Sequence, residues 1–392
     1  MSKPVLPTLA PSQIQALCRS LSLPAPAQVE APSTTGVYHA IYILTYPPTA
    51  DVSVPVHDSV KRLILRVAAP SLHRLKTLNE VAVLTWVHEH TSVPAPRVLA
   101  WDETTDNPLQ HEYILGEWLP GRLLLDLWHE LPASQWRPII AQLVDLVRDM
   151  QSHAFNHVGG LTIDRSGGDD IAASTVPPVV IPGQIHEFHF FTVNDMNLLP
   201  DPVAANIQGP WPNHAAYCLA QLRSSHAIIS THDSCIPLRS LPIATLICAL
   251  ETHPPPPPSR NVLAHRDLHL GNILYDPSIG RITGVLDWEL AACVPAHLWD
   301  PGNLLHPLVA SKRAKQARQE WLAIFAEMAT ERGGIGQREQ DVGEQVKRLD
   351  EATRLVRYLV DAYVRGWQRE QVKVMRTELV GLMGEVGIHA TD

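Results

Sequence analysis

A short polar motif, together with the hairpin that follows it, constrains this chain more than any other part of its sequence. The motif runs from His265 to Asn272 and reads HRDLHLGN. Residues 273–286 then hold two apolar stretches, which predict strands, separated by the turn-forming sequence DPSIG. Asp287 follows the second stretch. Because a hairpin brings its two ends together, we expect Asn272 and Asp287 to flank one small volume.

The oxygen atoms of this motif suit the transfer of a phosphoryl group. Such a transfer needs an oriented attacking hydroxyl and a neutralised phosphate charge. Asp267 is the candidate for orienting the hydroxyl, and the apolar residues 262–264 are expected to deliver it to the site. Asn272 and Asp287 are the candidate ligands for magnesium, which prefers oxygen and takes only one or two ligands from the protein.

The same motif allows a different kind of site. His265, Asp267 and His269 alternate, so in a strand they would share one face and could bind zinc, as in a metal-dependent hydrolase. Either histidine taken alone is more often a packed or solvated side chain. Asn272 and Asp287 favour phosphoryl transfer, because a zinc hydrolase has no need of them at these spacings.

The motif resembles the catalytic loop and metal-binding aspartate of the kinase-like fold, in the variant found in the aminoglycoside phosphotransferase family. That family's pattern is close to H-x-D-x-H-x-G-N followed by a D-W-E or D-F-E type segment. The chain is less similar to a protein kinase. Trp288 and Glu289 replace the Phe-Gly pair, and His269 stands where lysine is usual. The run from Asp287 to Asp300 leaves no room for a long activation loop.

The resemblance implies a bilobal, protein-kinase-like α+β fold, with a small antiparallel-sheet N-lobe and a mainly helical C-lobe. We expect an N-terminal helix and proline-rich entry at residues 1–30, a nucleotide-binding N-lobe at 31–120 and the C-lobe at 121–392. The C-lobe would hold the catalytic loop 265–272 and the metal-binding segment 286–289. The implied cofactors are ATP and magnesium. The implied activity moves the terminal phosphoryl of ATP to a hydroxyl of a small molecule that the sequence does not identify.

Residues 60–68 alternate as a strand, and the kinase-like fold places a phosphate-binding cation on this strand. Arg66 is the candidate cation. Ile64, on the same face, is the candidate for covering the nucleotide base. Glu80, on a helix that follows, is the candidate ion-pair partner of Arg66. Solvated surface positions are the alternative for Arg66 and Glu80. His265 and Asp300 are expected to brace the catalytic loop.

Two departures from the family's pattern motivate a second hypothesis. The strand and hinge at residues 112–121 resemble the place where adenine binds, and the backbone of Glu117 to Leu119 would bond the base edge. Gly116, just before them, replaces a larger residue that is often methionine. The phosphate-covering loop at residues 34–40 keeps a single glycine. The alternative is therefore a kinase-like pseudoenzyme or binding protein with weak or no phosphotransfer.

Composition and patterning limit the remaining possibilities. The chain of 392 residues is 45% hydrophobic and 18% charged, an ordinary globular mixture. A net charge of −9 without a basic run argues against a nucleic-acid partner. Five scattered cysteines without a CxxC pair fit a reducing compartment, and no apolar run approaches a membrane span. These features lead us to expect a cytoplasmic protein without a membrane partner.

Helical spacing of apolar residues predicts helices at 11–23, 308–332 and 338–384. In the family that the chain resembles, the residues corresponding to 160–255 determine acceptor specificity. No motif in this stretch identifies the acceptor. That stretch contains HEFHFF at residues 186–191. This aromatic cluster would either line an acceptor pocket or form a strand that caps the core.

Overall fold

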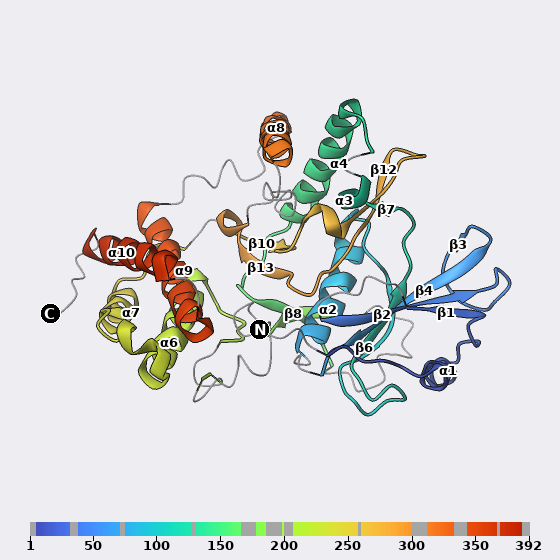
Figure 1. The fold of residues 1–392 in the computed structure, drawn as a ribbon, viewed down its shortest axis with the longest axis horizontal. Coiled ribbons are helices and arrows are strands. Elements are labelled where there is room, and N and C mark those ends of the chain that lie inside the picture. Colours follow the sequence, from blue (N-terminus) through green and yellow to red (C-terminus); the bar gives the residue numbers. More distant parts are fainter. Residues whose placement is uncertain are drawn as a thin grey trace.

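The computed structural model describes residues 5–31, 38–70, 75–127, 130–165, 178–185, 198–199, 207–257, 260–299, 312–332, 343–366 and 369–385. These residues form an N-lobe around an antiparallel sheet and a larger, mainly helical C-lobe (Figure 1). The bilobal kinase-like α+β fold expected from the sequence is therefore confirmed. In this part of the chain, no helix is both long enough and apolar enough to cross a membrane.

The N-lobe is built on a six-stranded sheet in the order β1-β2-β4-β6-β5, with β3 paired to β4. The strands are β1 (Gln28–Glu30), β2 (His39–Tyr46), β3 (Val56–His57), β4 (Val60–Ala68), β5 (Val98–Asp102) and β6 (Tyr113–Glu117). The central strand β4 has the predicted bounds and alternation. Leu63, Leu65 and Val67 are fully buried, whereas Ile64 and Arg66 are partly exposed on the other face.

Helix α1 (Pro11–Ser20) packs on the sheet and completes its core. Its predicted apolar face is buried at Ile14, Leu17 and Cys18. The helix ends before residue 23 because Ser22 adopts a left-handed conformation, with φ of 56°. Residues 11–20 thus belong to the N-lobe core.

Helix α2 (Leu75–His90) lies between the sheet and the C-lobe and is buried on almost all sides. Asn79 joins it to the C-lobe. Its amide nitrogen donates to the Ala291 carbonyl at 2.9 Å, and its oxygen accepts from the Leu161 backbone N–H, also at 2.9 Å. Leu161 belongs to β8 (Gly160–Ile163), which pairs with β9 (Val180–Gly183). One buried side chain therefore fastens α2 to two separate C-lobe segments.

The C-lobe core surrounds the motif at residues 265–272. The predicted hairpin is present as β11 (Ile273–Asp276) and β12 (Arg281–Val285), and β11 also pairs with β7 (Arg122–Leu123). Strand β10 (Asn261–Ala264) pairs with β13 (Ala292–Pro295). Helices α3 (Leu124–Leu127), α4 (Ala133–Gln151) and α8 (Lys312–Glu331) complete this part. Apolar residues of α4, α8 and these strands form one core, which also includes α2.

A second group of helices packs around its own apolar core and is here called the helical subdomain (Figure 1). It consists of α6 (His214–Thr231), the 3₁₀ turn η3 (Asp233–Leu238), α7 (Ile243–Thr252), α9 (Glu344–Arg365) and α10 (Arg369–Glu385). The helical structure predicted for residues 338–384 is confirmed at α9 and α10. Gly366 takes a φ of +69° and ends α9, so the segment forms two helices.

We predict that replacing Asn79 with alanine strongly destabilises the protein. The change leaves two buried backbone groups, one carbonyl and one N–H, without their partner. Each such group costs about 1–3 kcal/mol, so we expect a loss on the order of 3 kcal/mol in the free energy of unfolding. Chemical denaturation measures it. Glu89→Ala, at an exposed position of the same helix, is the control and should change little. Equal stability of the two variants would contradict the role of Asn79.

Candidate active site

The hairpin places the three oxygen-bearing residues of the motif together. The Asn272 carbonyl accepts the Leu286 N–H at 2.8 Å, so Asn272 lies directly beside the residue that precedes Asp287. The Asn272 amide nitrogen donates to the Asp267 carbonyl at 2.9 Å and lies 3.4 Å from the Asp267 carboxylate. The amide oxygen takes no part in these bonds. Asp267, Asn272 and Asp287 thus surround one volume, as the spacing predicted.

Two residues of the site have a backbone conformation that is unfavourable for any residue other than glycine. Arg266 has a φ of 64° and Asp287 a φ of 66°, both in the left-handed region. Such a conformation costs roughly 1–2 kcal/mol for a residue other than glycine, so surrounding contacts must hold it. Here it turns the chain sharply just before Asp267 and at Asp287.

His265 supplies those contacts. Its Nε2 is 2.9 Å from the Leu286 carbonyl, and its Nδ1 accepts the Asp267 backbone N–H at 3.3 Å. The ring is fully buried and packs against Trp288 with ring centroids 4.6 Å apart. Burial lowers the pKa of His265 to about 4, so the ring is neutral with its proton on Nε2. His265 ties the residue before Asp287 to Asp267 and is a positioning residue.

The zinc alternative does not fit this geometry. Both ring nitrogens of His265 are occupied by backbone groups, so neither can bind a metal without breaking the brace. Among the described residues, His265, Asp267 and His269 do not form a cluster of converging ligand atoms. His269 instead accepts the Gly271 N–H on Nδ1 at 3.0 Å, with Nε2 3.7 Å from the Asp267 carboxylate.

Asp267 is accessible at the mouth of the site, with 42% of its side chain exposed. Partial burial, reinforced by the nearby carboxylate of Asp287, raises the pKa of Asp267, while His269 and Asn272 oppose the rise. A raised pKa makes a carboxylate a better proton acceptor. The exposure leaves room for a second molecule to reach its oxygens.

Arg66 connects the N-lobe to this site. It forms an ion pair with the fully buried Glu80, and its Nη2 donates to the Asp287 carboxylate at 3.0 Å. The expected pair of Arg66 and Glu80 is therefore present, and neither residue is a solvated surface position. Burial lowers the pKa of the guanidinium, but the carboxylates of Glu80, Asp287 and Glu289 outweigh it, raise the pKa and keep the group charged. One cation thereby joins β4, α2 and the segment after the hairpin.

Sequence reasoning missed a buried cluster next to Arg66. The Glu289 carboxylate lies 3.6 Å from Lys76 Nζ and 3.4 Å from His39 Nδ1, and Lys76 and His39 are hydrogen-bonded to each other. Burial raises the pKa of Glu289 to about 7, although Lys76 opposes the shift. Burial and the two cations lower the pKa of His39, so its ring is neutral. Only Glu289 had a sequence signal, as the last residue of the Asp-Trp-Glu segment.

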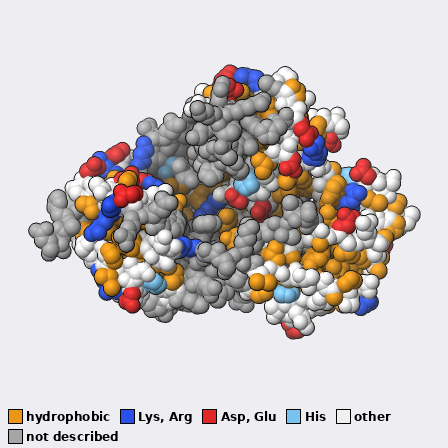
Figure 2. Space-filling model, in the orientation of Figure 1, with side chains coloured by type: hydrophobic (Ala, Val, Ile, Leu, Met, Phe, Trp, Pro, Cys, Tyr) orange, Lys and Arg blue, Asp and Glu red, His pale blue; other side chains and the backbone are white. Residues whose placement is uncertain are grey.

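The cluster anchors the start of β2 and the start of α2 to the segment after the hairpin. Figure 2 shows acidic, basic and histidine side chains gathered in the hollow near the middle of one face of the molecule. Arg66 and Lys76 already supply positive charge to Glu80 and Glu289. A metal ion is therefore not needed to neutralise these carboxylates.

The expected adenine end of the site lies along β4 and β6. Ile64 pairs with Gly116 across the two strands. The Glu117 N–H donates to the Arg97 carbonyl at 2.9 Å. A methyl group on Gly116 would lie 3.1 Å from that same Arg97 carbonyl, which explains a small residue here. The Leu119 side chain reaches across to Gly284 of β12.

Three sequence predictions fall outside the described residues. They concern most of the phosphate-covering loop (residues 32–37), the aromatic cluster at 186–191 and Asp300. The end of that loop, residues 38–40, is described and leads into β2.

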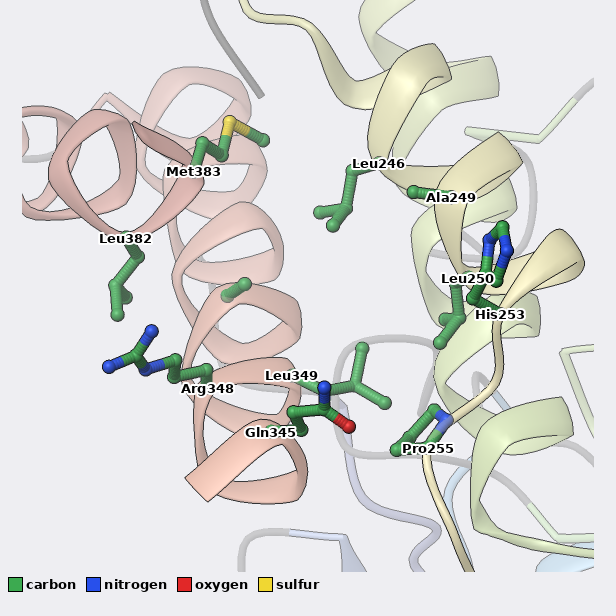
Figure 3. A pocket seen from close by; sticks show the side chains of 11 residues that line it. Leu246, Ala249, Leu250, His253, Pro255, Gln345, Arg348, Leu349, Leu382 and Met383 are labelled. Carbon is green, nitrogen blue, oxygen red and sulfur yellow. The ribbon is translucent and has the colours of Figure 1, made fainter. Parts of the chain in front are cut away.

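A cavity of about 280 Å³ opens between α7, α9 and α10 in the helical subdomain (Figure 3). Leucines 246, 250, 349 and 382 contribute much of its lining, with Arg348 and Gln345 at one side. None of the candidate site residues lines it. We therefore do not assign it to the nucleotide or to the acceptor.

Relatives among characterised sequences are distant. A subtelomeric hrmA-associated cluster protein of Aspergillus fumigatus is 21% identical over 276 residues, which cover 61% of this chain and 54% of that protein. Altered inheritance of mitochondria protein 9, mitochondrial, of Candida tropicalis is 27% identical over 158 residues, covering 39% and 24%. The chain thus spans about half the length, or less, of these relatives.

Among solved structures, a thermostable mutant of aminoglycoside phosphotransferase APH(4)-Ia in ternary complex with AMP-PNP and hygromycin B is similar, with a TM-score of 0.47 and 14% identity. The match covers 95% of this chain and 98% of that one. The GDP and kanamycin complex of APH(2")-IIIa also has a TM-score of 0.47, at 12% identity, with coverage of 96% and 99%.

The family assignment comes from a match that includes both the β4 strand and the catalytic motif. Residues 51–333, well over half of the chain, match the phosphotransferase enzyme family. These residues contain Arg66, Glu80, Asp267, Asn272 and Asp287. The chain belongs to the phosphotransferase enzyme family.

Proposed function

We propose that this protein transfers the terminal phosphoryl group of ATP to a hydroxyl group of a small molecule, with the nucleotide held between the lobes. The observation that carries the proposal is the convergence of Asp267, Asn272 and Asp287 beside the ion pair of Arg66 and Glu80. Phosphoryl transfer needs a hydroxyl-orienting carboxylate, metal-binding oxygens and a phosphate-binding cation. The described residues offer a candidate for each of the three within one site.

Asp267 is the proposed catalytic residue. Its accessible carboxylate accepts a hydrogen bond from the acceptor hydroxyl and takes the proton as the new O–P bond forms. The bond between the terminal phosphorus and its bridging oxygen breaks, and ADP leaves with that oxygen. The raised pKa of Asp267 suits this task, because a carboxylate that holds a proton more firmly accepts it more readily.

Asn272 and Asp287 are the proposed magnesium ligands, and the donor set fits the ion. Both offer oxygen, which Mg²⁺ prefers, and both lie beside the same turn of the hairpin. The Asn272 amide nitrogen is engaged by Asp267, so its oxygen remains for the ion. The Asp287 carboxylate is 36% exposed and is oriented by Arg66. When bound, magnesium would neutralise phosphate charge.

Arg66, oriented by Glu80, is the proposed contact for the phosphates that are not transferred. Ile64 and the backbone of Glu117 and Leu119 are proposed to hold the base. A small-molecule acceptor suits the site better than a protein. Strand β13 begins at Ala292, five residues after Asp287, so no long activation segment separates the proposed metal ligand from the core.

We predict that Asp267→Asn abolishes phosphoryl transfer while leaving nucleotide binding intact, because asparagine keeps the shape but cannot accept the proton. The assay follows terminal-phosphate label from ATP into a pool of hydroxylated small metabolites. Asp106→Asn, at an exposed loop position, is the matched control and should retain full turnover. Full turnover by Asp267→Asn would refute its assignment.

We predict that nucleotide stabilises the protein more with magnesium than without it, and that Asp287→Asn removes the magnesium-dependent part. A ligand that binds only the native state at 100 times its Kd stabilises that state by about 2.7 kcal/mol. Thermal unfolding with ATP and with ATP plus magnesium measures both effects. If ATP and magnesium do not change the thermal unfolding of the wild-type protein, the pseudoenzyme alternative is favoured.

We predict that Arg66→Met destabilises the fold by about 3–5 kcal/mol, because it leaves the buried Glu80 carboxylate unpaired. Adding Glu80→Gln should restore most of this stability, since the glutamine carries no charge. The double variant should nevertheless bind ATP more weakly than the wild-type protein, because it lacks the cation that is proposed to contact the phosphates. Denaturation and nucleotide titration of the wild-type protein and the two variants separate the two roles of Arg66. Wild-type nucleotide affinity in the stable double variant would contradict a phosphate contact by Arg66.

A further inference from the structure

A group of four potential metal ligands lies outside the proposed catalytic site. It joins the helical subdomain to the 3₁₀ turn η5 (Ala296–Leu298), which directly follows β13. We propose that His214, Cys218, His297 and Asp350 form a zinc site that fastens the helical subdomain to the catalytic core. This proposal is independent of the phosphotransferase reaction.

The four side chains converge from three segments of the chain. His214 Nε2 lies 3.3 Å from Cys218 Sγ and 2.6 Å from Asp350 Oδ1. His297 Nε2 lies 2.7 Å from Asp350 Oδ2. The ligand atoms of His214, Cys218 and Asp350 all lie within 4.8 Å of one another. One small volume is therefore shared by an imidazole nitrogen, a sulfur and a carboxylate, and the imidazole of His297 reaches the second oxygen of that carboxylate.

The scaffold of this cluster suits a closed site. His214 and Cys218 are four residues apart on α6, so they share one face of the helix. Asp350 comes from α9, and His297 from η5. His214 and Cys218 are almost fully buried, and the side chains of His297 and Asp350 are 11% and 16% exposed. The cluster is thus sealed from solvent by helices rather than mounted on a surface loop.

The chemistry of the set points to zinc. Structural zinc sites are tetrahedral and use cysteine, histidine and carboxylate ligands, whereas magnesium and calcium prefer oxygen alone. One thiolate and one carboxylate would balance the two positive charges of Zn²⁺, so the filled site would be neutral in its buried setting. The Cys218 thiol would release its proton to solvent as the metal binds.

The present separations lie close to those that a bound ion requires. Two nitrogen or oxygen ligands of a tetrahedral zinc ion stand about 3.3 Å apart, given bond lengths near 2.0–2.2 Å. A nitrogen and a sulfur ligand stand about 3.6 Å apart, because the Zn–S bond is near 2.3 Å, and the 3.3 Å between His214 Nε2 and Cys218 Sγ is close to this value. The contacts of Asp350 with the two histidines would lengthen by about 0.6 Å, which small rotations of the side chains accomplish.

The competing account is a hydrogen-bond network in which Asp350 accepts from both histidines and no metal binds. The two accounts predict different absorption spectra when cobalt(II) is added to the protein. Cobalt(II) in a tetrahedral site with a thiolate ligand absorbs strongly in the visible and shows a thiolate-to-cobalt band in the near ultraviolet. Cobalt bound to oxygen ligands at the proposed catalytic site gives neither feature, and excess magnesium would suppress it.

The experiment uses the full chain, purified without added metal, treated with chelator and titrated with Co²⁺ in excess Mg²⁺. We expect one equivalent of cobalt to produce both bands and one equivalent of Zn²⁺ to abolish them. Cys218→Ser should lose the near-ultraviolet band, and His297→Ala should weaken cobalt binding at least tenfold. Cys248→Ser, which removes the exposed cysteine of α7, is the matched control and should keep the wild-type spectrum.

Zinc should also raise the thermal unfolding midpoint of the wild-type protein and of Cys248→Ser, but not that of Cys218→Ser. Absence of the tetrahedral cobalt spectrum in the wild-type protein would overturn the proposal and leave a hydrogen-bond network. A near-ultraviolet band that persists in Cys218→Ser would overturn it too, because another thiol would then be the ligand. If Cys218→Ser does not fold, the wild-type spectrum and His297→Ala still decide.

Discussion

The contact of the Arg66 guanidinium with two carboxylates is the interaction on which the proposed active site depends. Arg66 reaches Glu80 on α2 and Asp287 after the hairpin, so three elements from both lobes meet at one charge. The neighbouring group of Lys76, His39 and Glu289 adds a second link between the same elements. Removing one member of such a buried network leaves charges uncompensated, so the site and the packing of the lobes are stabilised together.

Interactions between residues close in sequence could be predicted, and those between distant residues could not. The alternation of β4 and the turn residues of the hairpin at 276–280 reveal those elements directly. The pair of Arg66 and Glu80 was predicted only through the resemblance to a family. Asn79 and Lys76 carry no local signal, because a polar residue on a helix normally faces solvent. They are buried here only because α2 is covered by the C-lobe as well as by the sheet.

The two ends of the catalytic segment are held in different ways. On the N-lobe side, ion pairs attach Asp287 and Glu289 to β4 and α2. On the other side, His297 follows β13 and contacts Asp350 of α9, which belongs to the helical subdomain. Apolar residues of α6 also pack against β13, so the position of that subdomain relative to Asp267 depends on this packing as well as on the polar contacts.

The neutral ring of His265 also determines how the site responds to acid. The pKa of His265 falls from an ordinary value of 6.5 to about 4 on folding. Between these pH values, His265 is protonated in the unfolded chain but neutral in the folded protein. The associated stability is complete above about pH 6.5 and is lost as the pH falls toward 4. Protonation would place a hydrogen on Nδ1, facing the backbone N–H of Asp267. Mild acid would therefore loosen the turn that carries Asp267 before it disturbs the apolar cores of the two lobes.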